Sequence, residues 1–329
     1  MILDPTREGA LTRAADALAA GQLIGLPTET VYGLAADAQN ADAVARIFSA
    51  KGRPANHPLI VHIASAEAAE RFAAAMPPVA ARLAAAFWPG PLTLILPRRP
   101  GVADTAAGGH PTIGLRCPQH PVAQSLLAAC ATRGLHGLAA PSANRFGRIS
   151  PTTAAHVAAE FADLLVLDGG PCAIGIESAI VDCSRAQPAL LRPGALSAAA
   201  LEQAAGQRLS GAHEAAGPAT PAPGTLSAHY APRAKLRLMD AKMLQTALDV
   251  LGPQARHIAI WARTRLKTDA RQILLRPMPA QPEQAAHELF ATLRSFDDAQ
   301  VKLIWVETPP PEADWAGVAD RLHRAAASD

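Results

Sequence analysis

The segment KGRPANHPLIVHI, residues 51–63, joins the end of a predicted helix to a short apolar strand. Asp42 can cap this helix, whose last turn then holds Lys51. The strand Leu59–Ile63 is apolar except for His62, as expected of a strand buried in an α/β sheet. A lone histidine in such a strand is more often structural than a ligand, so the segment alone leaves its role open.

The same alternation of short apolar runs with Ala-rich helical stretches extends on both sides of this segment. It predicts a helix over Glu8–Ala20 and strands over Leu23–Leu26, Leu92–Leu96, Ile113–Leu115, Gly137–Ala140, Leu164–Leu167 and Ser178–Val181. Such alternation predicts an α/β fold with helices packed on a mixed, twisted sheet, although it does not reveal the order of the strands.

From about Gly206 the sequence becomes rich in Gly, Pro, Ala and Ser, which predicts a linker stiffened by prolines. After it, a second α/β alternation predicts strands at Lys235–Met239, Ile258–Trp261 and Val301–Val306 and helices at Ala241–Leu251, Glu283–Phe296 and Trp315–Ala326. The chain is therefore predicted to have a first domain over 1–207, a linker over 208–234 and a smaller α/β domain over 235–329.

Composition gives an ordinary globular protein, with 50% hydrophobic and 18% charged residues and a net charge of +2, too small to indicate nucleic-acid binding. The N-terminus does not resemble a signal peptide, and no run approaches the ~18 apolar residues of a membrane span. A cytoplasmic protein without membrane contact is expected.

No CxxC pair occurs, which favours isolated buried thiols over a zinc site at Cys117, Cys130, Cys172 and Cys183.

Polar clusters follow several predicted strands, while the phosphate loop GxxxxGK[ST], GxGxxG, HExxH and GxSxG are all missing. Thr28 and Thr30 follow a strand and could line a pocket or act only as turn and capping residues. Lys51 and Arg53 can converge on a polyphosphate, or simply complement the end of a helix.

Three further clusters lie later in the chain. Arg116 ends a strand, where it can reach a carboxylate or phosphate or stay at the surface. The stretch APSANRFGRISPTT, residues 140–153, offers hydroxyls, an amide and helix-terminal N–H groups suited to phosphate and adenine, or to turns alone. Glu177 and Ser178 begin a strand and Arg192 ends one, whereas Asp168 before two glycines is predicted to be a turn residue rather than a metal ligand.

Taken in order, these clusters resemble the threonylcarbamoyl-AMP synthase family, which is built on the YrdC-like domain. The KxR and SxN signatures correspond to Lys51-Gly-Arg53 and Ser142-Ala-Asn144. The surrounding segments also match, namely PTETVYGLAAD, KGRPANHPLIVHI, FWPGPLTLIL, IGLRCPQHP, GGPCAIGIESAIVD and LRPGALS. The segment PAPGTLSAHYAPRAKL is similar to the linker of the longer members. Small departures are Phe146, Ala179 and Ala228, where serine, threonine and serine are frequent.

The resemblance implies a YrdC-like twisted mixed sheet around a concave site and a small C-terminal, Rossmann-like α/β domain. It also implies condensation of L-threonine, bicarbonate and ATP into threonylcarbamoyl-AMP and pyrophosphate, a nucleotidyltransferase reaction that serves N6-threonylcarbamoyladenosine modification of tRNA. Mg²⁺ would accompany ATP without a tightly bound cofactor or a protein metal site, and tRNA threonylcarbamoyl-transfer proteins would use the product.

Residue roles carry over by position. The phosphates would face Lys51, Arg53 and His57, with Lys51 and Arg53 catalytic; the rest of the nucleotide would be held by Thr112, Ser142, Asn144, Ser150 and Arg192. Threonine would be surrounded by Thr30, His62, Arg116, Ser178 and the backbone of Ala140. Tyr230 would fold over the site as a lid that excludes water from the adenylate.

Two other functions are compatible with parts of the sequence. An RNA-binding module, with tRNA as a possible partner, would need a basic surface interleaved with aromatic residues, but aromatic residues are only 4%. Carbamoyl transfer in hydrogenase maturation uses a related domain, together with CxxC pairs and an acylphosphatase region that this sequence lacks.

Overall fold

The computed structural model describes residues 1–211, 214, 222–226 and 228–327. The chain divides into two compact units: Met1–Phe146 with Ser150–Thr225, and Gly147–Ile149 with Leu226–Asp329. The domain boundaries at 207 and 235 stay a prediction, and residues 212–213, 215–221 and 227 of the predicted linker lie outside the described residues.

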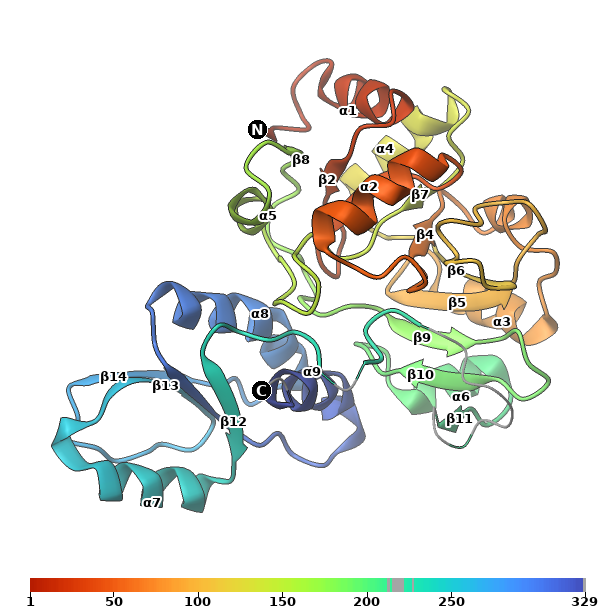
Figure 1. Cartoon of the computed structure of the whole chain (residues 1–329). Coiled ribbons are helices and arrows are strands. Elements are labelled where there is room, and N and C mark those ends of the chain that lie inside the picture. The colour runs from red at the N-terminus through yellow and green to blue at the C-terminus, as the bar shows by residue number, and fades with distance from the viewer. Residues whose placement is uncertain (212–213, 215–221, 227, 328–329) are drawn as a thin grey trace. The chain divides into compact units, whose positions relative to one another are not determined.

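The first unit contains an 11-stranded sheet in the order β1-β8-β2-β3-β7-β4-β6-β5-β9-β10-β11 (Figure 1). Its strands are β1 Ile2–Leu3, β2 Ile24–Leu26, β3 Gly33–Asp37, β4 Ile60–His62, β5 Leu92–Pro97, β6 Thr112–Arg116, β7 Leu138–Ala139, β8 Leu165–Leu167, β9 Ala179–Asp182, β10 Ala189–Arg192 and β11 Ser210–Gly211. Parallel pairs such as β4 with β6 alternate with antiparallel pairs such as β5 with β6, so the predicted mixed sheet is confirmed.

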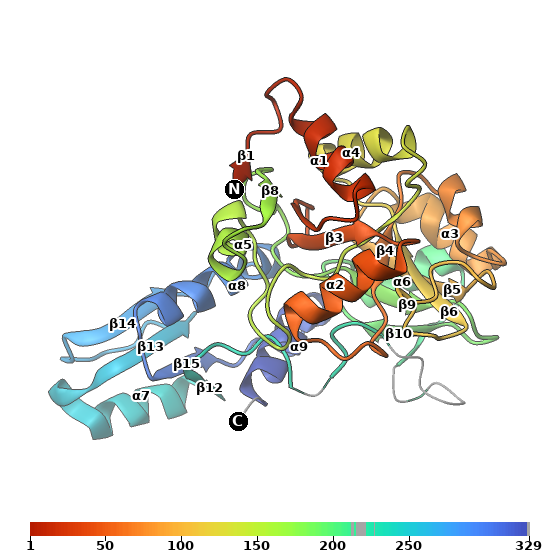
Figure 2. The same cartoon turned by 45° about the horizontal axis from the view of Figure 1, so that its top comes forward.

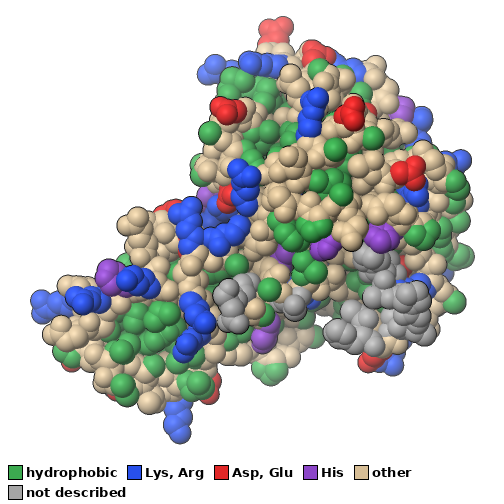
Figure 3. Space-filling view, in the orientation of Figure 1, with side chains coloured by type: hydrophobic (Ala, Val, Ile, Leu, Met, Phe, Trp, Pro, Cys, Tyr) green, Lys and Arg blue, Asp and Glu red, His purple; other side chains and the backbone are tan. Residues whose placement is uncertain are grey.

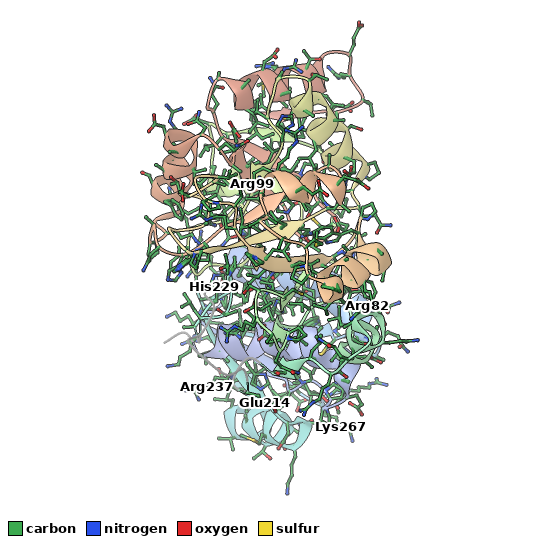
Figure 4. The ribbon with its side chains drawn as sticks, turned by 90° about the vertical axis from the view of Figure 1, so that its right-hand side faces the viewer. Arg82, Arg99, Glu214, His229, Arg237 and Lys267 are labelled. Atoms are coloured by element: carbon green, nitrogen blue, oxygen red, sulfur yellow. The ribbon has the colours of Figure 1, made fainter. Side chains whose placement is uncertain are left out.

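Helices of the first unit pack on this sheet through Ala-rich and Leu-rich faces. They are α1 Ala10–Ala19, α2 Ala41–Lys51, α3 Pro78–Phe87, α4 Pro121–Ala131, α5 Ala154–Glu160 and α6 Ala198–Ala205, with a 3-10 turn η1 at Glu67–Arg71. Helices α1 and α4 lie side by side and share one hydrophobic cluster (Figure 2). Arg82 on α3 donates 2.9 Å to the carbonyl oxygen of Ala205 at the end of α6 (Figure 4).

One local prediction is wrong. Asn40, not Asp42, caps α2: its extended backbone lets its side chain accept from the Ala43 N–H at 3.0 Å. Asp42 lies inside the helix, in its first turn, where its negative charge complements the helix dipole. Gly52 ends the helix in the left-handed conformation, with φ 64°, and this places Lys51 in the last turn as predicted.

The second unit contains a four-stranded parallel sheet in the order β12-β15-β13-β14. Its elements are β12 Lys235–Met239, α7 Ala241–Leu251, η2 Gly252–Gln254, β13 Arg256–Ala262, β14 Gln272–Pro277, α8 Pro282–Asp298, β15 Leu303–Glu307, η3 Ala313–Trp315 and α9 Ala316–Ala326. The predicted second α/β alternation is confirmed. The edge strand β14 escaped prediction because most of its residues are exposed, which removes the alternating pattern.

All four cysteines are free and buried, as predicted. No helix among the described residues is long and apolar enough to cross a membrane. Acidic and basic side chains are both spread over the face shown in Figure 3, among larger neutral and hydrophobic areas.

Candidate active site

Lys51 joins the two sequence signatures of the first unit. Its ammonium lies 2.5 Å from the carbonyl oxygen of Ser142 and 2.5 Å from that of Asn144. The Phe146 N–H also donates to the Lys51 carbonyl oxygen at 2.8 Å. An ammonium has three N–H donors, so two are used on this loop and one is left for an anion.

Burial strongly affects this lysine. Lys51 is 3% exposed, and this burial, together with the nearby charge of Arg53, holds its pKa well below 10.5. Glu160 and Glu177 act in the opposite direction without restoring the ordinary value. A phosphate would add negative charge beside the ammonium and so favour its protonated form.

Arg53 is held by backbone carbonyls and by an aromatic ring. Its guanidinium donates to Pro58 at 3.0 Å and lies 5.5 Å from the ring centre of Phe146, within cation–π distance. The His57 ring meets the same phenyl ring edge-on at 5.5 Å, and burial with the Arg53 charge lowers the pKa of His57. The departure at Phe146 therefore supplies a surface for two of the predicted phosphate ligands. We call Lys51, Arg53, His57 and residues 142–146 the Lys51 cluster.

The strand order brings His62 and Arg116 together. Strands β4 and β6 are parallel neighbours, and these two residues are partners in register. His62 is 3% exposed, its Nδ1 has no hydrogen-bond partner among the described residues, and burial followed by the Arg116 charge lowers its pKa to about 3. It is therefore a neutral imidazole at physiological pH.

Arg116 contacts groups from two other segments. It donates to Thr30 Oγ1 at 2.7 Å and to the Gly90 carbonyl oxygen at 3.3 Å, and forms an ion pair with Glu29 at 2.7 Å. The Thr30 hydroxyl in turn lies 2.9 Å from that of Thr28. Arg116, Glu29, Thr28, Thr30 and His62 are named the Arg116 cluster below.

The two clusters are connected through the segment that follows Thr30. The Tyr32 N–H donates to the Pro151 carbonyl oxygen at 2.9 Å, and the Ala143 N–H donates to that of Tyr32 at 2.8 Å. Ala140 is buried and donates to the Ile60 carbonyl oxygen at 3.0 Å. The loop that contacts Lys51 therefore runs beside the segment that contacts Arg116.

Ser178 and Arg192 form a third group. The Ser178 hydroxyl lies 2.8 Å from Thr93 Oγ1, and Arg192 donates to the Ser178 carbonyl oxygen at 2.9 Å and to that of Pro223 at 2.9 Å. Gly194 packs so closely here that a Cβ would lie 2.4 Å from the backbone nitrogen of Ala179. Arg192 thus joins the start of β9 to Pro223, which lies within the predicted linker.

The remaining predicted residues occupy several positions. Ser150 donates 2.5 Å to the buried Glu177 carboxylate. Thr112 begins β6, at the opposite end of that strand from Arg116. Asp168 accepts from the Gly170 N–H at 3.0 Å, so its predicted turn role is confirmed. Tyr230 is buried in the second unit, with its ring 5.4 Å from Phe290, so its role as a lid stays a prediction.

Two buried partners escaped the sequence reasoning, namely Glu29 and Thr93. Glu29 lies between two threonines whose hydroxyls attract attention, and a lone glutamate is usually a surface residue. Thr93 lies inside an apolar strand and resembles an ordinary β-branched core residue. Among the described residues, no group of three or more His, Cys, Asp and Glu gathers as metal ligands.

Known proteins and family models match this chain over nearly its whole length. The family model described as "Telomere recombination" matches residues 16–194, and "Threonylcarbamoyl-AMP synthase, C-terminal domain" matches residues 196–327. The threonylcarbamoyl-AMP synthase of Bacillus subtilis is 36% identical, covering 98% of this chain and 94% of its own. That of Pyrococcus abyssi is 36% identical over 95% of this chain and 92% of its own. A crystal structure of P. abyssi Sua5 complexed with L-threonine superposes with a TM-score of 0.88 at 34% identity, covering 99% and 97% of the two chains.

Proposed function

We propose specific roles for the clustered side chains of this chain, which belongs to the threonylcarbamoyl-AMP synthase family and contains both of its domains. The activity is the synthesis of threonylcarbamoyl-AMP, which serves modification of tRNA. We class it as a nucleotidyltransferase reaction, with ATP entering as its Mg²⁺ complex, L-threonine and bicarbonate as the other substrates, and pyrophosphate as the second product.

The first step joins threonine to bicarbonate. The neutral amine nitrogen of threonine bonds to the carbon of bicarbonate, water leaves, and a carbamate remains. In our assignment the Arg116 guanidinium receives the threonine carboxylate, while Thr30, Ser178 and the backbone of Ala140 surround the rest of the amino acid. His62 acts as a neutral hydrogen-bonding group, because its pKa of about 3 leaves it uncharged.

The second step transfers the adenylyl group. A carbamate oxygen bonds to the α-phosphorus of ATP while the bond to pyrophosphate breaks. We assign Lys51, Arg53 and His57 to the phosphates, because cations near the departing pyrophosphate offset its developing charge. Ser142, Asn144, Ser150, Thr112 and Arg192 would hold the nucleotide, and Tyr230 would keep water from the product.

One observation carries this assignment: the Lys51 ammonium bridges the carbonyl oxygens of Ser142 and Asn144 at 2.5 Å each. The cation of one signature and the loop of the other are thereby held in one place, inside a buried environment where charge interactions are strong. This is an arrangement suited to a polyphosphate without a glycine-rich loop.

The test is release of pyrophosphate with ATP, threonine and bicarbonate supplied together and then omitted singly. We expect release only with all three, and formation of the adenylate by mass spectrometry in the same samples. Pyrophosphate release that ignores threonine would contradict the assignment. We further place the enzyme in the cytoplasm, where ATP and the tRNA-modifying proteins that consume the adenylate are found.

A further inference from the structure

We propose that Glu29 is a positioning residue of the threonine site, which orients Arg116 toward the substrate carboxylate and compensates its charge. This inference rests on the proposed function, since it takes Arg116 as the carboxylate ligand. Glu29 itself touches Arg116 and is not assigned to the substrate.

The geometry singles out Glu29 as the charged contact of Arg116. Its Oε1 lies 2.7 Å from Arg116 Nη2, with the two side chains 9% and 4% exposed. Nη1 donates to Thr30 and Nε to Gly90, so each nitrogen of the guanidinium has a different partner. Hydrogen bonds at Nη1 and Nε, together with the ion pair at Nη2, hold the guanidinium in one orientation. Among the described residues Nη2 itself makes no hydrogen bond, so its N–H donors are available to a substrate carboxylate.

Charge explains why a carboxylate occupies this position. A guanidinium buried without a counter-ion carries a large desolvation cost, which a carboxylate at 2.7 Å offsets. Burial raises the pKa of Glu29, but Arg116 and the backbone N–H groups of Glu29 and Gln119 outweigh this and bring the pKa below its ordinary value. Glu29 is therefore ionised at neutral pH, and the Arg116 cluster carries no net charge before the amino acid binds.

The position of Glu29 is also fixed by its backbone. The Ile174 N–H donates to the Glu29 carbonyl oxygen at 2.8 Å. On either side, Thr28 and Thr30 join their hydroxyls at 2.9 Å. The backbone of Glu29 is therefore fixed by Ile174 independently of Arg116, while the neighbouring Thr30 hydroxyl also accepts from Arg116. A fixed backbone beside the guanidinium is what a positioning group requires.

The experiment compares Glu29→Gln, Arg116→Gln and the double variant with the parent enzyme. For Glu29→Gln we expect the KM for L-threonine to rise about ten-fold while the KM for ATP stays within about two-fold. L-Threoninamide lacks the carboxylate and serves as an inhibitor. The ratio of its inhibition constant to the KM for L-threonine measures the preference for threonine, and this ratio should fall by a similar factor. The double variant should match Arg116→Gln, because Glu29 acts through Arg116.

Glu307→Gln is the matched control, because Glu307 is a buried carboxylate paired with Arg263 at 3.0 Å in the second unit. It should leave the preference for threonine over threoninamide unchanged. Should Glu29→Gln not fold by its melting curve, Glu29→Asp keeps the charge on a shorter side chain and should give an intermediate loss of preference.

Additive effects in the double variant, or equal rises in both KM values with an unchanged preference, would overturn the role of Glu29. A parent enzyme whose pyrophosphate release ignores threonine would instead overturn the proposed function, so the two failures are distinguishable.

Discussion

Lys51 and Asn144 meet through a 2.5 Å hydrogen bond from the ammonium of the first to the carbonyl oxygen of the second. These residues are 93 positions apart in sequence. The contact makes the KxR and SxN signatures one structural unit, with the lysine serving as a support for the loop as well as a charge. A variant that removes the lysine should therefore disturb both phosphate neutralisation and loop geometry.

Arg53→Ala should abolish synthesis while the melting temperature stays close to that of the parent. The guanidinium donates to the backbone carbonyl oxygens of Pro58 and His57, at 3.0 and 3.4 Å, and these can bind water instead. Its charge, however, is difficult to replace at a departing pyrophosphate. Pyrophosphate release and a thermal melt measure the two effects, with the exposed Arg13→Ala as control. Retained activity with a normal melt would count against the assigned role.

The pH dependence should reveal the perturbed lysine. Burial and the Arg53 charge lower the pKa of Lys51 well below 10.5, and only the ammonium form neutralises a phosphate. We expect kcat/KM for ATP to fall on the alkaline side at a pH below 10.5, and this limb to be absent in Lys51→Arg, whatever activity remains. A limb at or above the ordinary lysine value would show that a different group is responsible.

His62 should influence acid stability but not catalysis near neutral pH. Its folded pKa of about 3 lies below the ordinary 6.5, so the unfolded state binds more protons between these values. Stability from this residue is therefore complete above pH 6.5 and declines as the pH falls toward 3. Unfolding of His62→Asn should depend less on pH in this window, as chemical denaturation at several pH values would measure. A rate inflection near 6.5 that disappears in the variant would instead identify a proton-transferring histidine.

Tyr230→Ala should both destabilise the second unit and shorten the life of the product. The ring is buried against Phe290 and lies beneath Arg321, so its loss removes about 3–5 kcal/mol of packing. If the HYAP segment closes over the reacting groups, the adenylate should also hydrolyse faster. Tyr230→Phe keeps the ring and is the matched control. Equal product yields over time in Tyr230→Ala and the parent would remove the lid role.

Gly194→Ala should destabilise the first unit by about 1–3 kcal/mol, because the added Cβ would lie 2.4 Å from the Ala179 backbone nitrogen and 2.9 Å from the Ser178 carbonyl carbon. Gly114→Ala is a suitable control, since its Cβ would make an ordinary contact of 3.5 Å with Thr93. Denaturant unfolding of the two variants would compare them. Equal losses of stability would mean that β9 moves to accommodate the methyl group.

Much of the fold was predictable because local patterns are encoded in consecutive residues. The predicted bounds of β12 and α7 agree with the structure, since a strand of alternating charged and apolar residues, a capping aspartate and an amphipathic helix follow one another there. Strand β3, Gly33–Asp37, escaped because small residues show no distinct periodicity. Asn40 escaped as a cap because Asp42 stands nearby with equal capping ability.

The sequence by itself determined the α/β class, the presence of two α/β alternations separated by a linker, and the ordered polar segments that resemble the family. Only the tertiary structure decided that β4 lies beside β6, so that His62 and Arg116 share a register, and that Arg116 takes Glu29 as its counter-ion. The reason is physical: helix and strand periodicity depend on neighbouring residues, whereas strand order and buried ion pairs depend on contacts between segments far apart in the chain.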